Sequence, residues 1–192
     1  MKRLGFDLVL LGDPTAGKDT QAEILKKKYT VKLIESGKYW RRKAKETSKD
    51  GAWLRATHDK GLPTPVPLMR KFLKEQVSRI PKNTDLVFVG NPRLKPEAQL
   101  LSKLLKIKKR DFFVLYLKLS KAKVIERTKS RSRSRKRSDD LHLNNRLKYF
   151  ELQVTKTVKY YKSLGKLKFI NGNQPINKVS KDIEKALARF KA

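Results

Sequence analysis

The sequence lacks two features that would direct it to particular classes of protein. It has no cysteine among its 192 residues, which excludes a disulfide framework and a thiolate metal site, so we expect no zinc. It also has no run of about 18 apolar residues, so we expect no membrane-spanning helix. The N-terminal residues lead directly into an apolar strand that carries the motif described below, and cleavage as a signal peptide would destroy it. A cytoplasmic protein without a membrane partner is therefore expected.

Acidic residues are also scarce, because 18 Asp and Glu face 49 Lys and Arg for a formal net charge of +31. Such a field attracts polyanions in general, from nucleotides to nucleic acids, without distinguishing among them. The basic residues are spread from Lys26 to Lys191, which is typical of a solvated basic surface rather than one dedicated stripe. We expect salt-dependent, sequence-independent association with nucleic acid at low ionic strength.

The most informative stretch reads G-D-P-T-A-G-K-D-T-Q at residues 12–21, directly after an apolar run that ends at Leu11. A strand, a glycine-bounded G-x-x-x-x-G-K turn and a helix form the context of a phosphate-binding loop, whereas a chance surface turn would lack that context. The loop N–H groups and the helix N-terminus favour anions, and Lys18 can reach the β- and γ-phosphates. The positions expected to bind the donor nucleotide here are Gly12, Pro14, Thr15, Ala16, Gly17, Lys18, Asp19 and Thr20.

Strands and helices are expected to alternate along the chain. Short apolar runs predict strands at residues 8–11, 31–34, 86–89, 112–117 and 167–170. Periodic apolar positions predict helices at residues 17–28, 66–79, 96–107, 121–131, 140–164 and 176–190, together with a basic helical stretch that ends near Lys49. Residues 51–66 are expected to contain a rigid turn at Gly61–Pro65. This order predicts one α/β domain, residues 1–192, with a parallel sheet between two helix layers.

With these motifs in order, the chain resembles the adenylate kinase branch of the nucleoside monophosphate kinases over nearly its whole length. The phosphate loop is similar to the family's G-x-P-x-x-G-K-G-T-Q, and S-G-K-Y-W-R at 36–41 resembles T-G-D-x-x-R. G-L-P-T-P at 61–65 resembles G-x-x-V-P, and V-G-N-P-R at 89–93 resembles D-G-[YF]-P-R. R-S-D-D at 137–140 resembles R-x-D-D, and N-G-N-Q-P at 171–175 resembles D-G-x-x-P.

The resemblance implies a P-loop kinase fold with a five-stranded parallel sheet, a monophosphate-binding insert at 35–65 and a short lid at 130–140. It implies Mg²⁺-dependent, reversible transfer of a phosphoryl group from ATP to AMP, by a monomer. The donor would also contact Arg127, Asn173, Gln174 and Pro175. The acceptor would contact Ser36, Gly37, Arg41, Thr64, Gly90, Arg93 and Glu97. The catalytic cations would be Lys18, Arg93, Arg131, Arg137 and Arg146.

The alternating serine and arginine residues at 130–138 allow two interpretations. By composition alone they are typical of a disordered or RNA-binding segment. Arg131 and Arg137 nevertheless occupy family positions without a change in length, which favours a lid loop. Asp139 and Asp140 are expected to pair with lid arginines or to cap the following helix.

Three positions depart from the family pattern. Val89 replaces an aspartate that helps to organise the hydrated Mg²⁺, and Asp19 replaces a glycine. We hypothesise that Asp19 supplies the metal-site oxygen that Val89 lacks; the alternative is that it caps the helix or pairs with a lysine. Glu97 aligns with a glutamine that reads adenine. A glutamate can accept a hydrogen bond from the exocyclic amino group of AMP or CMP, a group that UMP lacks.

Two other functions remain open from the sequence. A CMP or UMP kinase would share the fold, and a basic nucleic-acid-binding protein on a degenerate kinase fold would explain the charge. Adenylate kinase activity is preferred because the full set of cations is retained.

Overall fold

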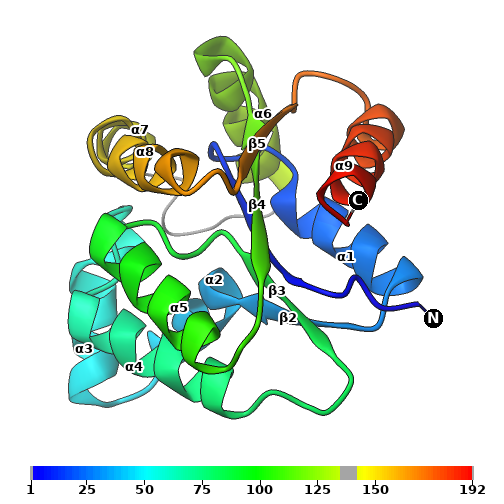
Figure 1. Ribbon diagram of the computed structural model, residues 1–192. Helices are drawn as coiled ribbons and strands as arrows, with labels where there is room; N and C mark the ends of the chain where they lie inside the picture. The colour runs from blue at the N-terminus through cyan, green and yellow to red at the C-terminus, as the bar shows by residue number, and fades with distance from the viewer. Residues whose placement is uncertain (1, 135–141, 192) are drawn as a thin grey trace.

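The sheet lies at the centre of the protein. The structure, a computed structural model, describes residues 2–134 and 142–191 (Figure 1). Within these residues five parallel strands pair in the order β2-β3-β1-β4-β5. This confirms the predicted five-stranded parallel sheet. The strands are β1 (Asp7–Gly12), β2 (Val31–Glu35), β3 (Asp85–Val89), β4 (Phe112–Lys118) and β5 (Leu167–Asn171).

Helices cover both faces of the sheet, as predicted for a three-layer fold. Helices α1 and α9 lie on one face, and α4, α5 and α8 lie on the other (Figure 1). The bounds are α1 (Lys18–Lys28), α2 (Ser36–Lys43), α3 (Lys49–Ala56), α4 (Val66–Ser78), α5 (Lys95–Ile107), α6 (Lys121–Ser134), α7 (Leu143–Tyr149), α8 (Thr155–Ser163) and α9 (Ile176–Lys191), with a 3₁₀ turn η1 (His58–Lys60) and a π-helix η3 (Phe150–Val154).

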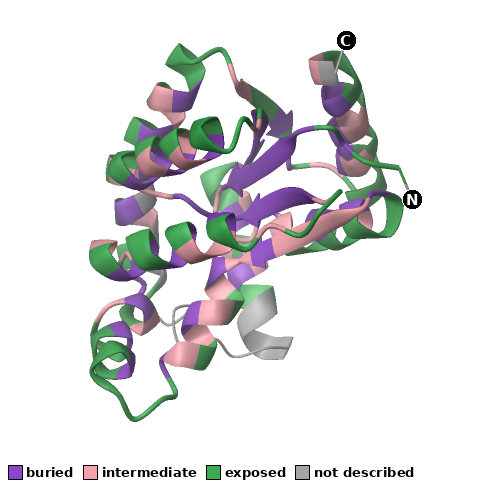
Figure 2. Ribbon diagram, turned by 60° about the horizontal axis from the view of Figure 1, so that its bottom comes forward, coloured by how far each residue is buried: buried purple, intermediate pink, exposed green. Residues whose placement is uncertain are grey.

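The central strands are buried on both sides, which explains their unbroken apolar sequences. Leu8, Val9 and Leu10 are wholly inaccessible to solvent, and Figure 2 shows the strands at the buried centre of the molecule. Side chains on one face of the sheet pack with α4, α5 and α8, and those on the other pack with α1, α6 and α9. In the part of the chain that the structure describes, no helix is long and apolar enough to cross a membrane.

One helix in the segment between β2 and β3 was not predicted. The basic helical stretch expected to reach Lys49 ends at Lys43, and a new helix, α3, begins at Lys49. Ser48 caps α3, because its hydroxyl accepts a hydrogen bond from the Gly51 N–H at 3.1 Å. A side chain at Gly51 would collide with the Glu46 carbonyl oxygen, 2.2 Å from an ideal Cβ. This close contact requires a glycine at position 51.

The predicted helix at 140–164 also differs from the structure. Its described part is divided into α7, the π-helix η3 and α8. Tyr149 and Val154 are both buried, and they lie five positions apart. The i→i+5 turns of a π-helix bring such residues to one face, whereas an α-helix rotates them apart. Asp139 and Asp140, expected as caps, lie outside the described residues.

Salt bridges stabilise the sheet at the amino-terminal ends of its strands. Asp7, wholly buried at the start of β1, accepts hydrogen bonds from Arg110 Nε at 2.8 Å and Nη2 at 2.6 Å. Arg3 donates a single hydrogen bond from Nη2 to the buried Asp85 at the start of β3, whereas the Arg110–Asp7 pair is bidentate. Bidentate bonds of this type compensate the desolvation of a buried carboxylate. This end of the sheet is opposite the phosphate loop, and its role is structural.

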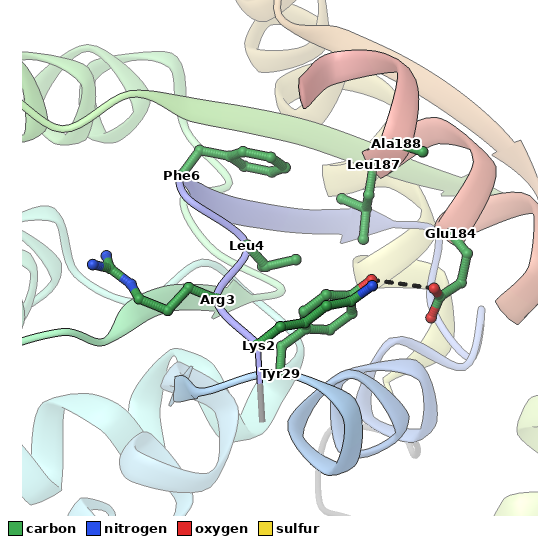
Figure 3. A pocket seen from close by; sticks show the side chains of 8 residues that line it. All are labelled: Lys2, Arg3, Leu4, Phe6, Tyr29, Glu184, Leu187 and Ala188. Carbon is green, nitrogen blue, oxygen red and sulfur yellow. Dashed lines mark hydrogen bonds between the residues drawn. The ribbon is translucent and has the colours of Figure 1, made fainter. Parts of the chain in front are cut away.

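The end of α1 is joined to α9 by a single carboxylate. Glu184 accepts hydrogen bonds from the Tyr29 hydroxyl at 3.1 Å and the Lys28 ammonium at 3.0 Å. Figure 3 shows the Tyr29–Glu184 hydrogen bond beside a cavity of about 190 Å³ that Lys2 and Leu187 also line, while the Arg3 side chain points away toward β3. Burial and the Glu184 charge raise the pKa of Tyr29.

Candidate active site

The phosphate loop connects β1 to α1 at the carboxyl ends of the strands, where open α/β sheets bind their ligands. Gly12 must be a glycine, because an ideal Cβ there would lie 2.5 Å from the Leu117 carbonyl oxygen of β4. Thr15 adopts a left-handed conformation with φ 59°, which is rare for a β-branched residue and costs about 1–3 kcal/mol. Strain of this kind is typical of ligand-binding loops. Pro14 and Ala16 are buried, and Thr20 is exposed on α1.

The Lys18 side chain curls back over this loop. Its ammonium donates hydrogen bonds to the carbonyl oxygens of Gly12 at 2.8 Å and Asp13 at 2.7 Å. Lys18 is the first residue of α1 and Gly17, in a left-handed conformation, is its N-cap. The positive charge therefore lies where the loop N–H groups and the helix dipole also favour an anion.

Asp13 fastens the loop to the sheet, a role that we did not predict from the sequence. Its Oδ1 accepts a hydrogen bond from the Tyr116 hydroxyl at 2.6 Å, and its Oδ2 accepts one from the Leu119 N–H at 2.7 Å. Burial and, to a lesser extent, the bond to Asp13 raise the pKa of Tyr116. A carboxylate inside a loop that binds phosphate needs such donors, because it would otherwise repel the ligand. An aspartate inside a phosphate-binding loop was therefore the feature of the sequence that could have indicated these hydrogen-bond donors.

A second cation lies beside Lys18. The Gly90 N–H at the end of β3 donates to the Leu10 carbonyl of β1 at 2.9 Å, so the two strand ends meet. An ideal Cβ on Gly90 would lie 3.6 Å from Lys18 Cε and 3.9 Å from Arg93 Nη2. The Lys18 and Arg93 side chains therefore flank one small residue, 75 positions apart along the chain.

The backbone and side chain of Arg93 are both held in place. Its Nε donates to the Gly90 carbonyl at 2.9 Å, and its own carbonyl accepts from the Thr157 hydroxyl of α8 at 2.6 Å. Thr157 is wholly buried, so this hydroxyl is a positioning contact that the sequence did not reveal. The only signal in the sequence was one of the two threonines of α8, which is too weak to identify the contact.

Glu97 caps the helix that follows Arg93. One carboxylate oxygen accepts hydrogen bonds from the N–H groups of Arg93 at 3.0 Å and Leu94 at 3.1 Å. The side chain is 2% exposed, and this burial raises the pKa of the carboxyl group. The sequence pointed to Glu97 as a contact of the acceptor base, and in the structure its carboxylate holds the backbone of Arg93.

The other residues expected at the acceptor lie at the end of β2. Ser36 is buried at the start of α2, Thr64 is buried just before α4, and Gly37 makes room for the Arg41 guanidinium, 3.2 Å from an ideal Cβ. Asn91, wholly buried, donates to the carbonyls of both Ile34 and Val89 at 3.2 Å. The ends of β2 and β3 are thereby joined, and α2 begins next to the Gly90–Arg93 segment.

The phosphate loop, α6 and the segment at 172–175, which are all expected to contact the donor nucleotide, also meet. Arg127 of α6 donates to the Thr15 carbonyl of the phosphate loop at 3.5 Å and to the Gly172 carbonyl at 3.2 Å. Asn173 accepts from the Ser120 N–H at 3.2 Å, which ties this segment to the start of α6. Gln174 donates to Asp182 at 2.6 Å, and Pro175 precedes α9. Arg127 is the link between the loop and the segment at 172–175.

The three arginines expected in and near the lid are only partly located. The backbone of Arg131 lies in the final turns of α6, one turn beyond Arg127, and that of Arg146 lies in α7. Arg137 lies outside the described residues. The first part of the expected lid loop is helical, because α6 continues to Ser134. Next to Arg146, the Asn145 amide donates to the Lys60 carbonyl at 3.1 Å, so α7 contacts the segment before α4.

The carboxylates near the phosphate loop differ in their availability to a metal. Asp13 is engaged by Tyr116 and Leu119, whereas Asp19 is exposed in the first turn of α1. In the described part of the chain, no three His, Cys, Asp or Glu side chains gather into a group that could hold an ion. Mg²⁺ bound with ATP needs only one or two carboxylates beside phosphates and water, and the exposed Asp19 carboxylate fits that requirement.

A parallel sheet of this strand order, with a phosphate loop after β1 and a second cation at the end of β3, defines a nucleotide phosphotransferase of the P-loop kinase class. A family model described as adenylate kinase matches residues 10–166. An adenylate kinase of Synechococcus sp. (strain JA-2-3B'a(2-13)) is 30% identical over 188 residues, which cover 96% of this chain and 97% of the relative. An adenylate kinase of Brucella melitensis biotype 1 is 30% identical over 190 residues, with 94% and 97% covered. The chain belongs to the adenylate kinase family.

Proposed function

We propose that the protein catalyses the reversible transfer of a phosphoryl group from ATP to AMP, giving two ADP. The observation that carries this proposal is the approach of both Lys18 and Arg93 to the Cβ position of Gly90. Transfer between two phosphates asks the protein for positioning and for neutralisation of charge, and the acceptor phosphate is itself the nucleophile. Two fixed cations from different strand ends meet that need. The family relationship favours AMP over CMP or UMP and an active enzyme over a degenerate one.

Lys18 and the N–H groups of the phosphate loop hold the β- and γ-phosphates of ATP. Support comes from the position of the ammonium over the loop, where its present acceptors are two carbonyls that phosphate oxygens can replace. Arg127 and residues 173–175 hold the adenine. The planar guanidinium spans the loop and Gly172, which suits stacking on a base.

The segment at 35–65 holds AMP. Arg41 and Arg93 bind its phosphate, with Ser36, Gly37, Thr64 and Gly90 forming the surrounding surface. Glu97 acts mainly through Arg93, whose N–H it binds. Because a carboxylate can accept from an exocyclic amino group of AMP or CMP, we expect weaker base selectivity than a glutamine would give.

The segment at 130–140 closes over the transferring phosphoryl group. Arg131 and Arg137 on the segment and Arg146 on α7 then stabilise negative charge in the transition state, and closure excludes water that would hydrolyse ATP. Support for Arg131 comes from its place one turn beyond Arg127 on α6. Support for Arg146 comes from its neighbour Asn145, which contacts Lys60 of the acceptor segment.

Mg²⁺ accompanies ATP, and the Asp19 carboxylate replaces the one missing at Val89. When bound, the ion neutralises phosphate charge. Asp19 is exposed one residue beyond Lys18, and Val89 is buried at the end of β3. Changing Asp19 to Gly should raise the Mg²⁺ concentration needed for half-maximal turnover, and changing the exposed Glu23 to Gln on the same helix should not. Unchanged Mg²⁺ dependence in the Asp19 variant would refute this role.

The remaining expectations concern the surroundings of the enzyme. It acts as a monomer in the cytoplasm, without zinc, and its positive charge draws nucleic acid to its surface at low salt. Sedimentation at equilibrium tests the oligomeric state.

A turnover panel with ATP and each of AMP, CMP, UMP and GMP tests the proposed activity. AMP should give the highest kcat/KM. Changing Lys18 or Arg93 to Ala should lower kcat by about 10²–10³, as for other deletions of a transition-state contact. Lys26→Ala and Arg42→Ala are matched controls, since both side chains are exposed. Turnover of CMP or UMP above AMP, or an undiminished Lys18→Ala variant, would refute the proposal.

A further inference from the structure

A groove lined by lysines lies between α5 and α8, on the face of the sheet away from α1 and α9. The two helices pack against each other (Figure 1). Between their ends and the start of β4 lies a hollow of about 650 Å³. The basic side chains that line it are Lys103, Lys106, Lys109, Arg110 and Lys166.

Two further hollows each share one lining residue with it. Tyr160 also lines a second hollow of about 350 Å³, together with Lys95, Lys156 and Lys159. Arg110 also lines a third of about 290 Å³ beside the end of α4, together with Arg3, Lys82 and Lys108. We call these three neighbouring hollows the α5–α8 groove. At about 1.5 Å per residue, the 13 residues of α5 alone give it a length of about 20 Å.

The positive charge of the groove is mostly uncompensated. Lys166, Arg110 and Arg3 pair with Asp111, Asp7 and Asp85 respectively. In contrast, eight lysines of the groove form no salt bridge with any residue in the described ranges: Lys82, Lys95, Lys103, Lys106, Lys108, Lys109, Lys156 and Lys159. Like charges gathered along one groove repel one another and focus the field for an anionic ligand.

The cavity of Figure 3, on the α1–α9 side, provides a contrast. There Glu184 accepts hydrogen bonds from the Lys28 ammonium and from the Tyr29 hydroxyl, so a carboxylate offsets part of the local positive charge; Figure 3 shows the Tyr29 contact. Asp111 is the only acidic residue among the described residues that line the α5–α8 groove, and Lys166 already pairs with it.

Apolar and aromatic surface accompanies the lysines. The partly exposed Tyr160 lines the largest hollow together with Leu164, which is 42% exposed, while Phe112 at its floor is buried. A simple inorganic anion has no use for such surface, whereas a base stacks on it. Positive side chains that follow a backbone, with aromatic side chains between them, are the elements with which proteins bind single-stranded nucleic acid.

The groove also offers neutral hydrogen-bonding groups. The Gln99 amide and the Ser102 hydroxyl line the largest hollow among the lysines. Such groups can bind the 2′-hydroxyl of a ribose, which is what distinguishes RNA from DNA at a protein surface. This favours RNA as the occupant.

We propose that the α5–α8 groove binds single-stranded RNA, with phosphates on the unpaired lysines and a base against Tyr160. Its largest hollow is separate from the site that binds the nucleotides. The largest hollow begins at Phe112, the first residue of β4, whereas the phosphate loop contacts Leu117 near the other end of that strand. At about 3.3 Å per residue, Phe112 and Leu117 are about 17 Å apart. RNA and the nucleotide substrates can therefore occupy their sites at the same time.

The test measures the fluorescence anisotropy of a labelled oligouridylate of about 12 nucleotides, within the ~4–16-nucleotide site sizes of single-strand binders. The groove variant changes Lys103, Lys106 and Lys159 to Gln. The control variant changes Lys178, Lys181 and Lys185, which are exposed on α9, to Gln. Both variants lose the same net charge, so a difference between them reports position rather than total charge.

We expect the groove variant to bind about tenfold more weakly than the wild type, and the slope of log affinity against log salt to fall by about 2, at ~0.7 per phosphate contact. The control should change affinity by about threefold or less, because charges beyond a Debye length of ~10 Å are screened. Equal losses in the two variants would mean a general charge effect and would overturn the proposal.

A second variant tests the base contact. Tyr160→Leu keeps apolar volume but removes the ring, and we expect a loss of about tenfold with an unchanged salt slope, since stacking does not release counterions. Urea unfolding checks that the variant is folded; a folded variant with full affinity would refute the base contact.

Three comparisons complete the test. A saturating ATP–AMP bisubstrate analogue should leave RNA affinity unchanged, and displacement of the RNA by the analogue would place it in the nucleotide site and refute the proposal. Oligothymidylate should bind more weakly than oligouridylate, and tighter binding of DNA or of a duplex would contradict the assignment to single-stranded RNA. The turnover of ATP and AMP, measured in parallel, should be the same in the groove and control variants.

Discussion

Asp13 and Tyr116 provide the sharpest test of how the phosphate loop is held. The Asp13 carboxylate accepts two hydrogen bonds, from the Tyr116 hydroxyl at 2.6 Å and the Leu119 N–H at 2.7 Å. Tyr116 and Leu119 are 7% and 6% exposed, so neither donor can turn to bulk water. A hydrogen bond to a charged group contributes about 1.5–3 kcal/mol. Changing Asp13 to Ala should therefore lower the free energy of unfolding by about 3–6 kcal/mol, a large part of the ~5–15 kcal/mol of a typical domain.

Asp13→Asn is the more useful variant, because it should remain folded. An amide accepts at one atom only and directs an N–H toward the other donor, so we expect a loss of about 1.5–3 kcal/mol. Tyr116→Phe removes one donor and should cost about 1–2 kcal/mol. In the double variant the lost contact is shared, and the two effects should fall short of additivity by about 1 kcal/mol or more.

Urea unfolding of the four proteins gives this coupling energy directly. Asp50→Asn serves as the control, because Asp50 is exposed in the first turn of α3, and it should change stability by at most about 0.5 kcal/mol. The same variants should lose turnover, since a displaced loop misplaces Lys18. Additivity within about 0.5 kcal/mol, or full turnover in Asp13→Asn, would refute the claim that this carboxylate holds the loop.

Three further outcomes follow from the site. Changing Arg127 to Ala should raise the KM for ATP by about tenfold, because it removes a stacking cation, and leave the KM for AMP nearly unchanged; initial rates measure both, and equal rises would contradict the assignment. Burial raises the pKa of Glu97, so its contribution to stability is complete below the ordinary value of about 4.3 and is lost as pH rises through the folded pKa. Glu97→Gln keeps an acceptor oxygen and should match the wild type in urea unfolding near pH 4 but be more stable at pH 7; lower stability at pH 7 would refute this. Burial also raises the pKa of the buried tyrosines 116, 149 and 161, so stability should hold below about pH 10 and fall above it by up to about 4 kcal/mol per pH unit, and a flat thermal unfolding profile there would exclude the effect.

The sheet and the phosphate loop could be predicted because local sequence determines them. A strand buried on both faces needs continuous apolar residues, such as Leu8 to Leu11, and a loop that passes close to β4 needs Gly12. These requirements leave a mark at the residue itself. Parallel strands then bring their carboxyl ends together, so the meeting of Gly90 with the loop follows from the topology.

Features that depend on tertiary contacts could not be predicted. Helix α3 was not predicted within residues 51–66, and the need for glycine at position 51 is visible only in the approach of the Glu46 carbonyl. The hydroxyl of Thr157 becomes important only when α8 lies against Arg93. The resemblance pointed to Glu97 as a contact of the acceptor base, and the direction of its side chain depends on two backbone N–H groups at the start of α5.

The charge of +31 has two separable physical effects, and only one of them requires a site. A positive field raises the encounter rate with every anion, nucleotides included, and loses its effect as salt rises. The groove and control variants lose equal charge, so the salt dependence of kcat/KM should shift equally in both. RNA affinity should instead fall mainly in the groove variant, because Lys103, Lys106 and Lys159 line neighbouring hollows that also contain Tyr160. A shift in kcat/KM confined to the groove variant would mean that these lysines steer nucleotides toward the phosphate loop rather than bind RNA.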